Sequence, residues 1–140
     1  MEMKTVSREW QQRRLKEYVL PDAVYYQTVW AVRDLERMEK RIKELDRELR
    51  AGHNSSSIVC EGKRNYSVMR PTESRAVEKV LLEGRVKAIR NALNMVPESY
   101  RGFIMDNIVY RTKAKGYASK IWRIWKQRFL YQVARNLSLI

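Results

Sequence analysis

Residues 28–49 read TVWAVRDLERMEKRIKELDREL, and the spacing of their apolar side chains decides the fold class. The positions that share one helical face follow each other at alternating intervals of three and four residues: Thr28, Ala31, Leu35, Met38, Ile42, Leu45 and Leu49. This heptad stripe predicts a helix that buries one face against a partner helix. Acidic and basic residues nearly cancel on its other faces, which is typical of a solvated scaffold. We expect the helix to begin near Asp22 and to end at Ala51–Gly52.

A second long helix is predicted after a loop. Residues 52–71 lack helical periodicity and are rich in Asn and Ser, so we expect a flexible loop there. Pro71 and Thr72 then open a helix whose stripe is formed by Leu82, Val86, Ile89, Leu93 and Val96. Two stripes of similar length separated by a loop indicate an antiparallel helical pair. The periodicity also allows pairing between chains, as a homodimer through the heptad helix 28–49.

The flanking segments complete an all-α fold, because five glycines and three prolines are too few for the turns of an all-β protein. Residues 1–22 are expected to form an N-terminal extension or a short helix, the helix running from Ser7 to Tyr18. Residues 23–97 hold the helical pair with its loop, and residues 98–140 form a small helix-turn-helix-like unit. In this last unit, a helix follows Pro97, RTKAKGYA turns the chain, and a final helix runs from Ser119 to about Leu137.

The charge of the chain favours a polyanionic partner. The net charge is +13, and residues 98–140 supply more than half of it, with nine cations and two acidic residues. No stretch approaches the roughly 18 apolar residues that cross a membrane, so we expect a cytoplasmic, nucleoid-associated protein without a membrane partner. His53 and Cys60 are the single histidine and cysteine. They can form neither a disulfide nor a zinc site, and no metal or cofactor is expected.

The final helix separates aromatic from cationic side chains. Trp122, Trp125, Phe129 and Val133 share one face, which we expect to pack inward. The other surface presents Arg, Lys and Gln, which can bind guanine and adenine edges in the major groove or neutralise phosphates. The residues expected to contact double-stranded DNA lie on this surface and in the preceding turn: Lys113, Lys115, Ser119, Lys120, Arg123, Ile124, Lys126, Gln127, Arg128 and Tyr131.

Three segments resemble phage late-gene transcriptional regulators of the RinA/ArpU type. RPTESRAVEKVLLEGRVKAIRNAL is similar to that family's "PTE…A" helix entry, and ESYRGFIMDNIVYR to the helix before its DNA-binding turn. SKIWRIWKQRFLYQVARNLSLI resembles its aromatic-rich recognition helix, with Trp125 and Lys126 at the family's Trp-Lys positions. The resemblance covers residues 70–140, and RTKAKGYA is shorter than the family pattern. It implies a helix-turn-helix similar to sigma factor region four, a role in transcription regulation, and RNA polymerase as a further candidate partner.

Other functions remain open at this point. A phage DNA-packaging component, such as a small terminase subunit, also combines a DNA-binding helix with coiled-coil assembly. A coiled-coil interaction protein would use the helical pair alone. An enzyme is not expected, because the chain has one histidine, no glycine-rich phosphate loop, and a single acidic residue, Asp106, after Glu98.

Overall fold

The computed structural model describes residues 11–54, 70–112 and 119–140, and within these ranges the chain is entirely helical. A 3-10 turn, η1 (Lys16–Tyr18), comes before five α-helices. The α-helices are α1 (Asp22–Arg33), α2 (Leu35–Asn54), α3 (Pro71–Leu93), α4 (Glu98–Tyr110) and α5 (Ser119–Asn136). The predicted all-α fold is confirmed.

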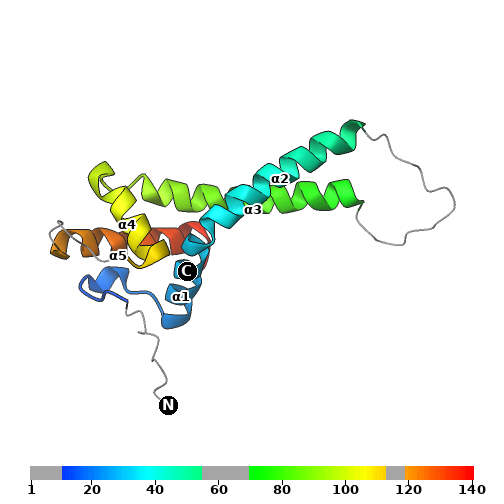
Figure 1. The fold of residues 1–140 in the computed structure, drawn as a ribbon. Coiled ribbons are helices and arrows are strands. Elements are labelled where there is room, and N and C mark those ends of the chain that lie inside the picture. The colour runs from blue at the N-terminus through cyan, green and yellow to red at the C-terminus, as the bar shows by residue number, and fades with distance from the viewer. Residues whose placement is uncertain (1–10, 55–69, 113–118) are drawn as a thin grey trace, which may run out of the picture.

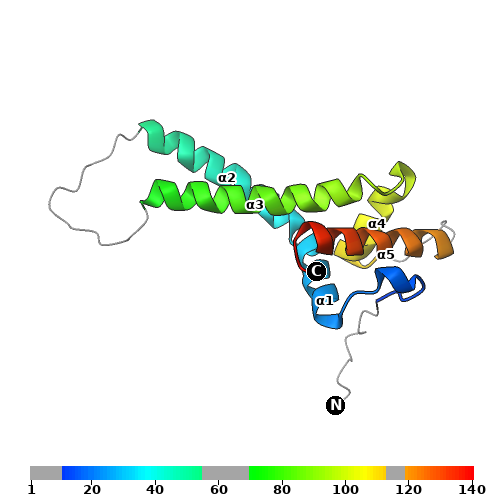
Figure 2. The same ribbon diagram turned by 180° about the vertical axis from the view of Figure 1, so that it is seen from behind.

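Helices α2 and α3 form the predicted antiparallel pair. Leu35, Met38 and Leu45 of the heptad stripe are buried, as are Leu82 and Ile89 of the facing stripe. Figures 1 and 2 show the two helices projecting from a body that contains α1, α4 and α5. We call this projection the arm. Because α3 covers the heptad stripe within one chain, that stripe is not available to a second chain, and a dimer would need another surface.

Ion pairs between α2 and α3 flank the buried stripe of the arm. Glu39 near the start of α2 pairs with Arg90 near the end of α3, and Glu48 later in α2 pairs with Arg75 near the start of α3, as an antiparallel pair requires. The pairs Arg41–Glu78 and Asp46–Lys79 lie between them. The Arg41 guanidinium holds the pKa of the Glu78 carboxyl below its ordinary value, and Lys79 does the same for Asp46. The charges that were expected to be merely solvated therefore also fix the register of the arm.

The predicted helix from Asp22 to Gly52 is wrong in one respect, since it is divided at Asp34 into α1 and α2. The backbone N–H of Asp34 donates to Trp30 and Ala31, which closes α1. The Asp34 carboxylate accepts two hydrogen bonds from the Arg37 guanidinium, and this places an acid at the positive end of α2. The heptad pattern could not show this break, because the stripe continues in register across it.

Other helix ends also differ from the prediction. The helix expected to end at Tyr18 is reduced to η1 where the structure describes it, because Leu15 turns its backbone toward another element. Pro21 and Arg70, rather than Asp22 and Thr72, occupy the positions before α1 and α3. Helix α2 continues past Gly52 to Asn54, and α5 ends within one residue of the expected Leu137.

One continuous hydrophobic core joins the three helices of the body to the base of the arm. Val32 of α1, Ile89 of α3, Ile104 of α4, and Phe129 and Val133 of α5 are almost fully buried in it. Helices α4 and α5 therefore share their core with α1 and α3. Of the expected loop 52–71, residues 55–69, which include Cys60, lie outside the described residues, as does the His53 side chain.

Candidate nucleic-acid interface

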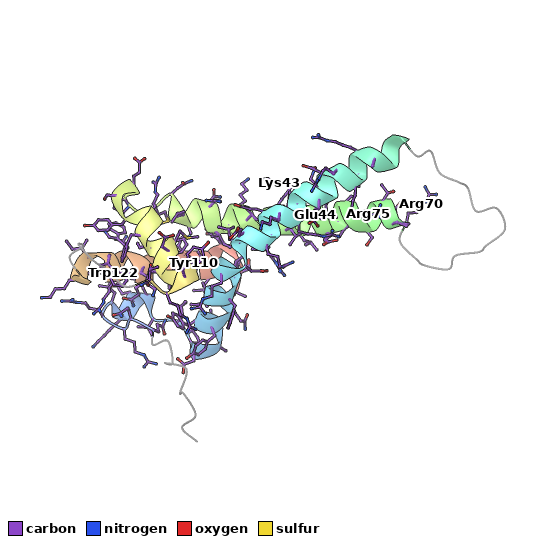
Figure 3. All side chains as sticks on the ribbon, viewed as in Figure 1. Lys43, Glu44, Arg70, Arg75, Tyr110 and Trp122 are labelled. Atoms are coloured by element: carbon purple, nitrogen blue, oxygen red, sulfur yellow. The ribbon has the colours of Figure 1, made fainter. Side chains whose placement is uncertain are left out.

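Helix α5 turns its aromatic face inward, as predicted. Trp122, Phe129 and Val133 are buried, and Trp125 is half-buried. The Trp122 ring meets the Phe103 ring of α4 edge to face, with 5.1 Å between centroids; Figure 3 places Trp122 in the body. This packing leaves Lys120 and Arg123 exposed at the amino-terminal half of the helix.

The N-terminal segment crosses α5 at Gln127 and covers part of the surface that we expected to be free. Leu15 donates its backbone N–H to the Gln127 side-chain oxygen at 3.2 Å, and the Gln127 amide donates to the Leu15 carbonyl at 2.9 Å. Gln127 is only 4% exposed. The prediction that Gln127 is exposed to read adenine is therefore wrong, because both its polar atoms are bonded to the Leu15 backbone.

Three further predicted contact residues have structural partners. Tyr131 packs edge to face on Tyr18, with centroids 5.0 Å apart, and is half-buried. The Lys126 ammonium donates to the Asn107 side chain of α4 at 2.7 Å. The Arg128 guanidinium lies over the Trp125 ring at 4.9 Å. The Tyr131 and Lys126 contacts attach α5 to its neighbours, and so does the Arg128 guanidinium, which also lies 5.5 Å from the Tyr18 ring centre. Lys126, which was expected to contact DNA, bonds to α4.

Of the six remaining predicted contact residues, the structure describes the side chains of three. Lys120 and Arg123 are exposed and make no ion pair within the described part of the chain. Ile124 is half-buried beside them. Lys113, Lys115 and the side chain of Ser119 lie outside the described residues. Of the three exposed cations of α5, Lys120 and Arg123 lie in its first two turns and Arg135 lies in its last turn.

Two cations that the sequence reasoning missed come from the N-terminal segment. Arg14 and Lys16 flank Leu15 and are exposed, so the hydrogen bonds to Gln127 bring both to the surface of α5. Arg123 lies one helical turn before Gln127, on the same face and about 6 Å along the axis. We call the surface formed by Arg14, Lys16, Lys120, Arg123 and Arg128 the basic face.

The basic face is not uniformly positive, because Glu17 is exposed next to Lys16. Arg13, by contrast, points to Asp22, with 3.5 Å between the charged groups. The doublet Arg13–Arg14 is visible in the sequence as a short basic run. Its place beside α5 is set by a contact between residues 112 positions apart, and no local pattern could reveal that.

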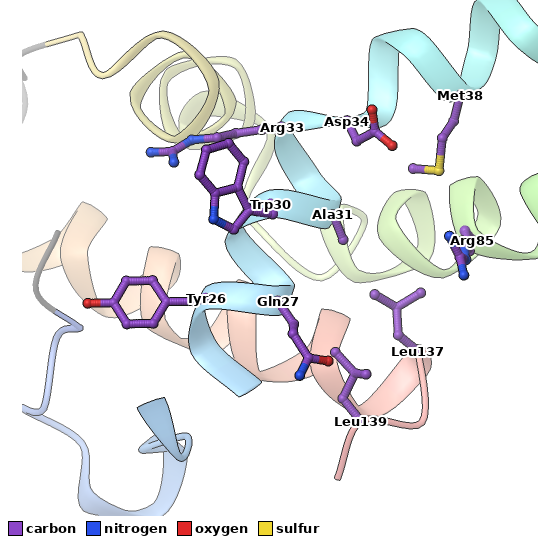
Figure 4. A pocket seen from close by; sticks show the side chains of 10 residues that line it. All are labelled: Tyr26, Gln27, Trp30, Ala31, Arg33, Asp34, Met38, Arg85, Leu137 and Leu139. Atoms are coloured by element: carbon purple, nitrogen blue, oxygen red, sulfur yellow. The ribbon is translucent and has the colours of Figure 1, made fainter. Parts of the chain in front are cut away.

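A separate open pocket of about 770 Å³ lies between α1, α3 and the C-terminal residues (Figure 4). Two of its charged groups, on Arg33 and Asp34, are already engaged. The Arg33 guanidinium donates to the Ile108 carbonyl at 2.9 Å and lies 5.2 Å from the Trp30 ring centre. Hydrogen bonds from Arg37 hold the pKa of the Asp34 carboxyl below its ordinary value, so Asp34 is an ion-pair partner rather than a proton donor at neutral pH.

Within the ranges that the structure describes, every helix is too short or too polar to cross a membrane. Comparisons of the chain with protein-family models, with curated proteins and with solved structures give no significant match.

Proposed function

We propose that this chain binds double-stranded DNA through the basic face. The observation that carries the proposal is the convergence of exposed cations from two distant segments on the amino-terminal half of α5. Cations that neutralise phosphates release condensed counterions, which is the main source of affinity in such complexes. The net charge of +13 adds a long-range attraction for DNA.

The structure changes how the DNA contact is expected to work. With Gln127 buried, the side chains left for base contacts at the start of α5 are Lys120 and Arg123, both able to donate to guanine. Arg14 and Lys16 supply phosphate contacts beside them. We therefore expect a large salt-dependent component of binding and a small number of base contacts. Transcription regulation follows from the resemblance of residues 70–140 to RinA/ArpU-type regulators.

The test is fluorescence anisotropy of the full chain on a labelled duplex over a range of salt concentrations. Replacing Lys120 and Arg123 by Ala should weaken binding and lower the slope of log K against log salt by about 2. The pair Arg14→Ala and Lys16→Ala should have a similar effect. Lys43→Ala with Arg47→Ala is the matched control, because both residues are exposed cations on the arm. Equal losses in all three double variants would contradict a localised DNA site.

A packaging component remains the second candidate, and the projecting arm is the feature that favours it, because such proteins assemble through helical elements. The mass of the protein in solution separates the two functions. A closed ring of many chains supports packaging, whereas a monomer or a dimer supports a regulator.

A further inference from the structure

The outer face of α3, turned away from α2, carries an apolar stripe that the described residues leave uncovered. Val77, Val80 and Leu81 are 46%, 65% and 63% exposed. Gly84 continues the stripe at the same helical spacing, and a Cβ built on it would meet nothing within 4 Å. The stripe stops at Ala88, which is buried where Asn136 of α5 donates to its carbonyl at 3.0 Å. Three large apolar side chains in two turns of a solvated helix indicate a contact surface.

We propose that this stripe binds the same stripe of a second copy of the chain, with the two α3 helices antiparallel. The two-fold axis passes between Val80 and Leu81, which makes the contact isologous. Val80 then meets Val80, and Leu81 meets Leu81. The Val77 side chain of each copy faces Gly84 of the other, where the missing Cβ leaves room for it. The stripe thus carries both a protruding side chain, Val77, and a matching gap at Gly84, as a surface that binds its own copy requires.

Charge supports the same antiparallel arrangement. In this register Glu73 of one copy lies beside Lys87 of the other, on the flank of the stripe that carries Val80. Both residues are exposed, and neither makes an ion pair within the described part of the chain. By contrast, nearby Glu78 and Lys79 are already paired with α2. The two charges left over on the outer face are thus of opposite sign and sit symmetrically about the proposed axis.

The experiment is sedimentation velocity of the full chain over a range of concentrations. The wild type should dimerise reversibly. Leu81→Glu places two carboxylates together at the axis and should weaken the dimer at least about tenfold. Met95→Glu is the matched control, because Met95 is also an exposed apolar residue but follows the end of α3 and lies beyond the stripe. This substitution should leave the dimer unchanged.

Charge reversal tests the register itself. Glu73→Lys should weaken self-association by about fivefold, because two Lys–Lys contacts replace two ion pairs, and Lys87→Glu should do the same. Mixing the two single variants should restore dimers, since every cross-pair is then attractive, and the double variant should also dimerise. A monomeric wild type would overturn the proposal, and so would single reversals whose mixture associates no better than either alone. None of these readouts depends on DNA binding.

Discussion

Replacing Gln127 by Ala tests whether this residue holds the N-terminal segment or reads DNA. The substitution removes both side-chain hydrogen bonds to Leu15, whose backbone N–H and carbonyl are then left without partners against α5. A buried unpaired group costs about 1–3 kcal/mol. We therefore expect the free energy of unfolding to fall by about 2–3 kcal/mol. The loss is limited by the docking energy of the segment, because the segment can leave α5 and hydrate its backbone.

Urea denaturation measures the stability loss, and limited trypsin digestion shows where it occurs. Arg13, Arg14 and Lys16 are trypsin sites within the docked segment, so cleavage there should accelerate before the core unfolds. Gln127→Met keeps a side chain of similar length but cannot form the hydrogen bonds, so it should lose nearly as much stability as Ala. This comparison separates the hydrogen bonds from the loss of packing.

Gln132→Ala is the control on the same helix, because its side chain bonds only to exposed Asn136. Its effect should stay below about 0.5 kcal/mol. The reasoning is refuted if Gln127→Ala leaves the stability and the trypsin pattern unchanged while it alters the DNA sequence preference. That result would mean that Gln127 is free to contact bases.

Three further predictions concern stability. Neighbouring cations hold the pKa values of Asp46 and Glu78 below their ordinary range, so the unfolded chain binds more protons than the folded chain in acid. The free energy of unfolding should therefore be constant above about pH 5 and fall as the pH drops below about 4. Urea titrations should show a shallower decline for the double variant Asp46→Asn, Glu78→Gln. Ser138 ends α5 with a φ of 59°, so Ser138→Gly should raise the free energy of unfolding by about 1 kcal/mol in urea titrations, whereas Ser138→Ala should not. Gly84→Ala should stabilise the dilute monomer against heat by about 1 kcal/mol and weaken the dimer by filling the gap opposite Val77; a stronger dimer would contradict the proposed register.

The elements with regular patterns could be predicted from the sequence. The stripes of α2 and α3, the inward face of α5 and the concentration of cations in its first turns all follow from spacing alone, because side chains on one helical face share one environment. Periodicity could not reveal the break at Asp34. The stripe continues from Ala31 to Leu35 with its regular spacing on either side of Asp34. The break depends on how α1 packs against the body.

The candidate site was predicted only in part, for a related reason. Helical spacing shows that Arg123, Gln127 and Tyr131 share a face, but it does not show what covers that face. The cover comes from residues 11–20, whose backbone needs a polar partner at Leu15, and Gln127 supplies it. A glutamine between aromatic residues fits either role, so the fold was needed to distinguish a buried amide from one that reads bases.

Salt should separate the two proposed surfaces, because they attract their partners by different forces. Four of the eight acidic residues of the arm pair with cations across α2 and α3, and the outer stripe of α3 is held mainly by apolar contact. Within the described part of the chain, the cations of the basic face make no ion pair, and Glu17 is an exposed acid near them. Raising the salt concentration to about 0.5 M shortens the screening length to less than half of its value at 0.1 M. DNA binding should then fall by orders of magnitude, while the dimer loses only the contribution of Glu73 and Lys87. If DNA binding, measured by anisotropy, and the dimer, measured by sedimentation, were lost at the same salt concentrations, the proposed apolar contact between α3 helices would be refuted. This conclusion would hold whatever the basic face binds.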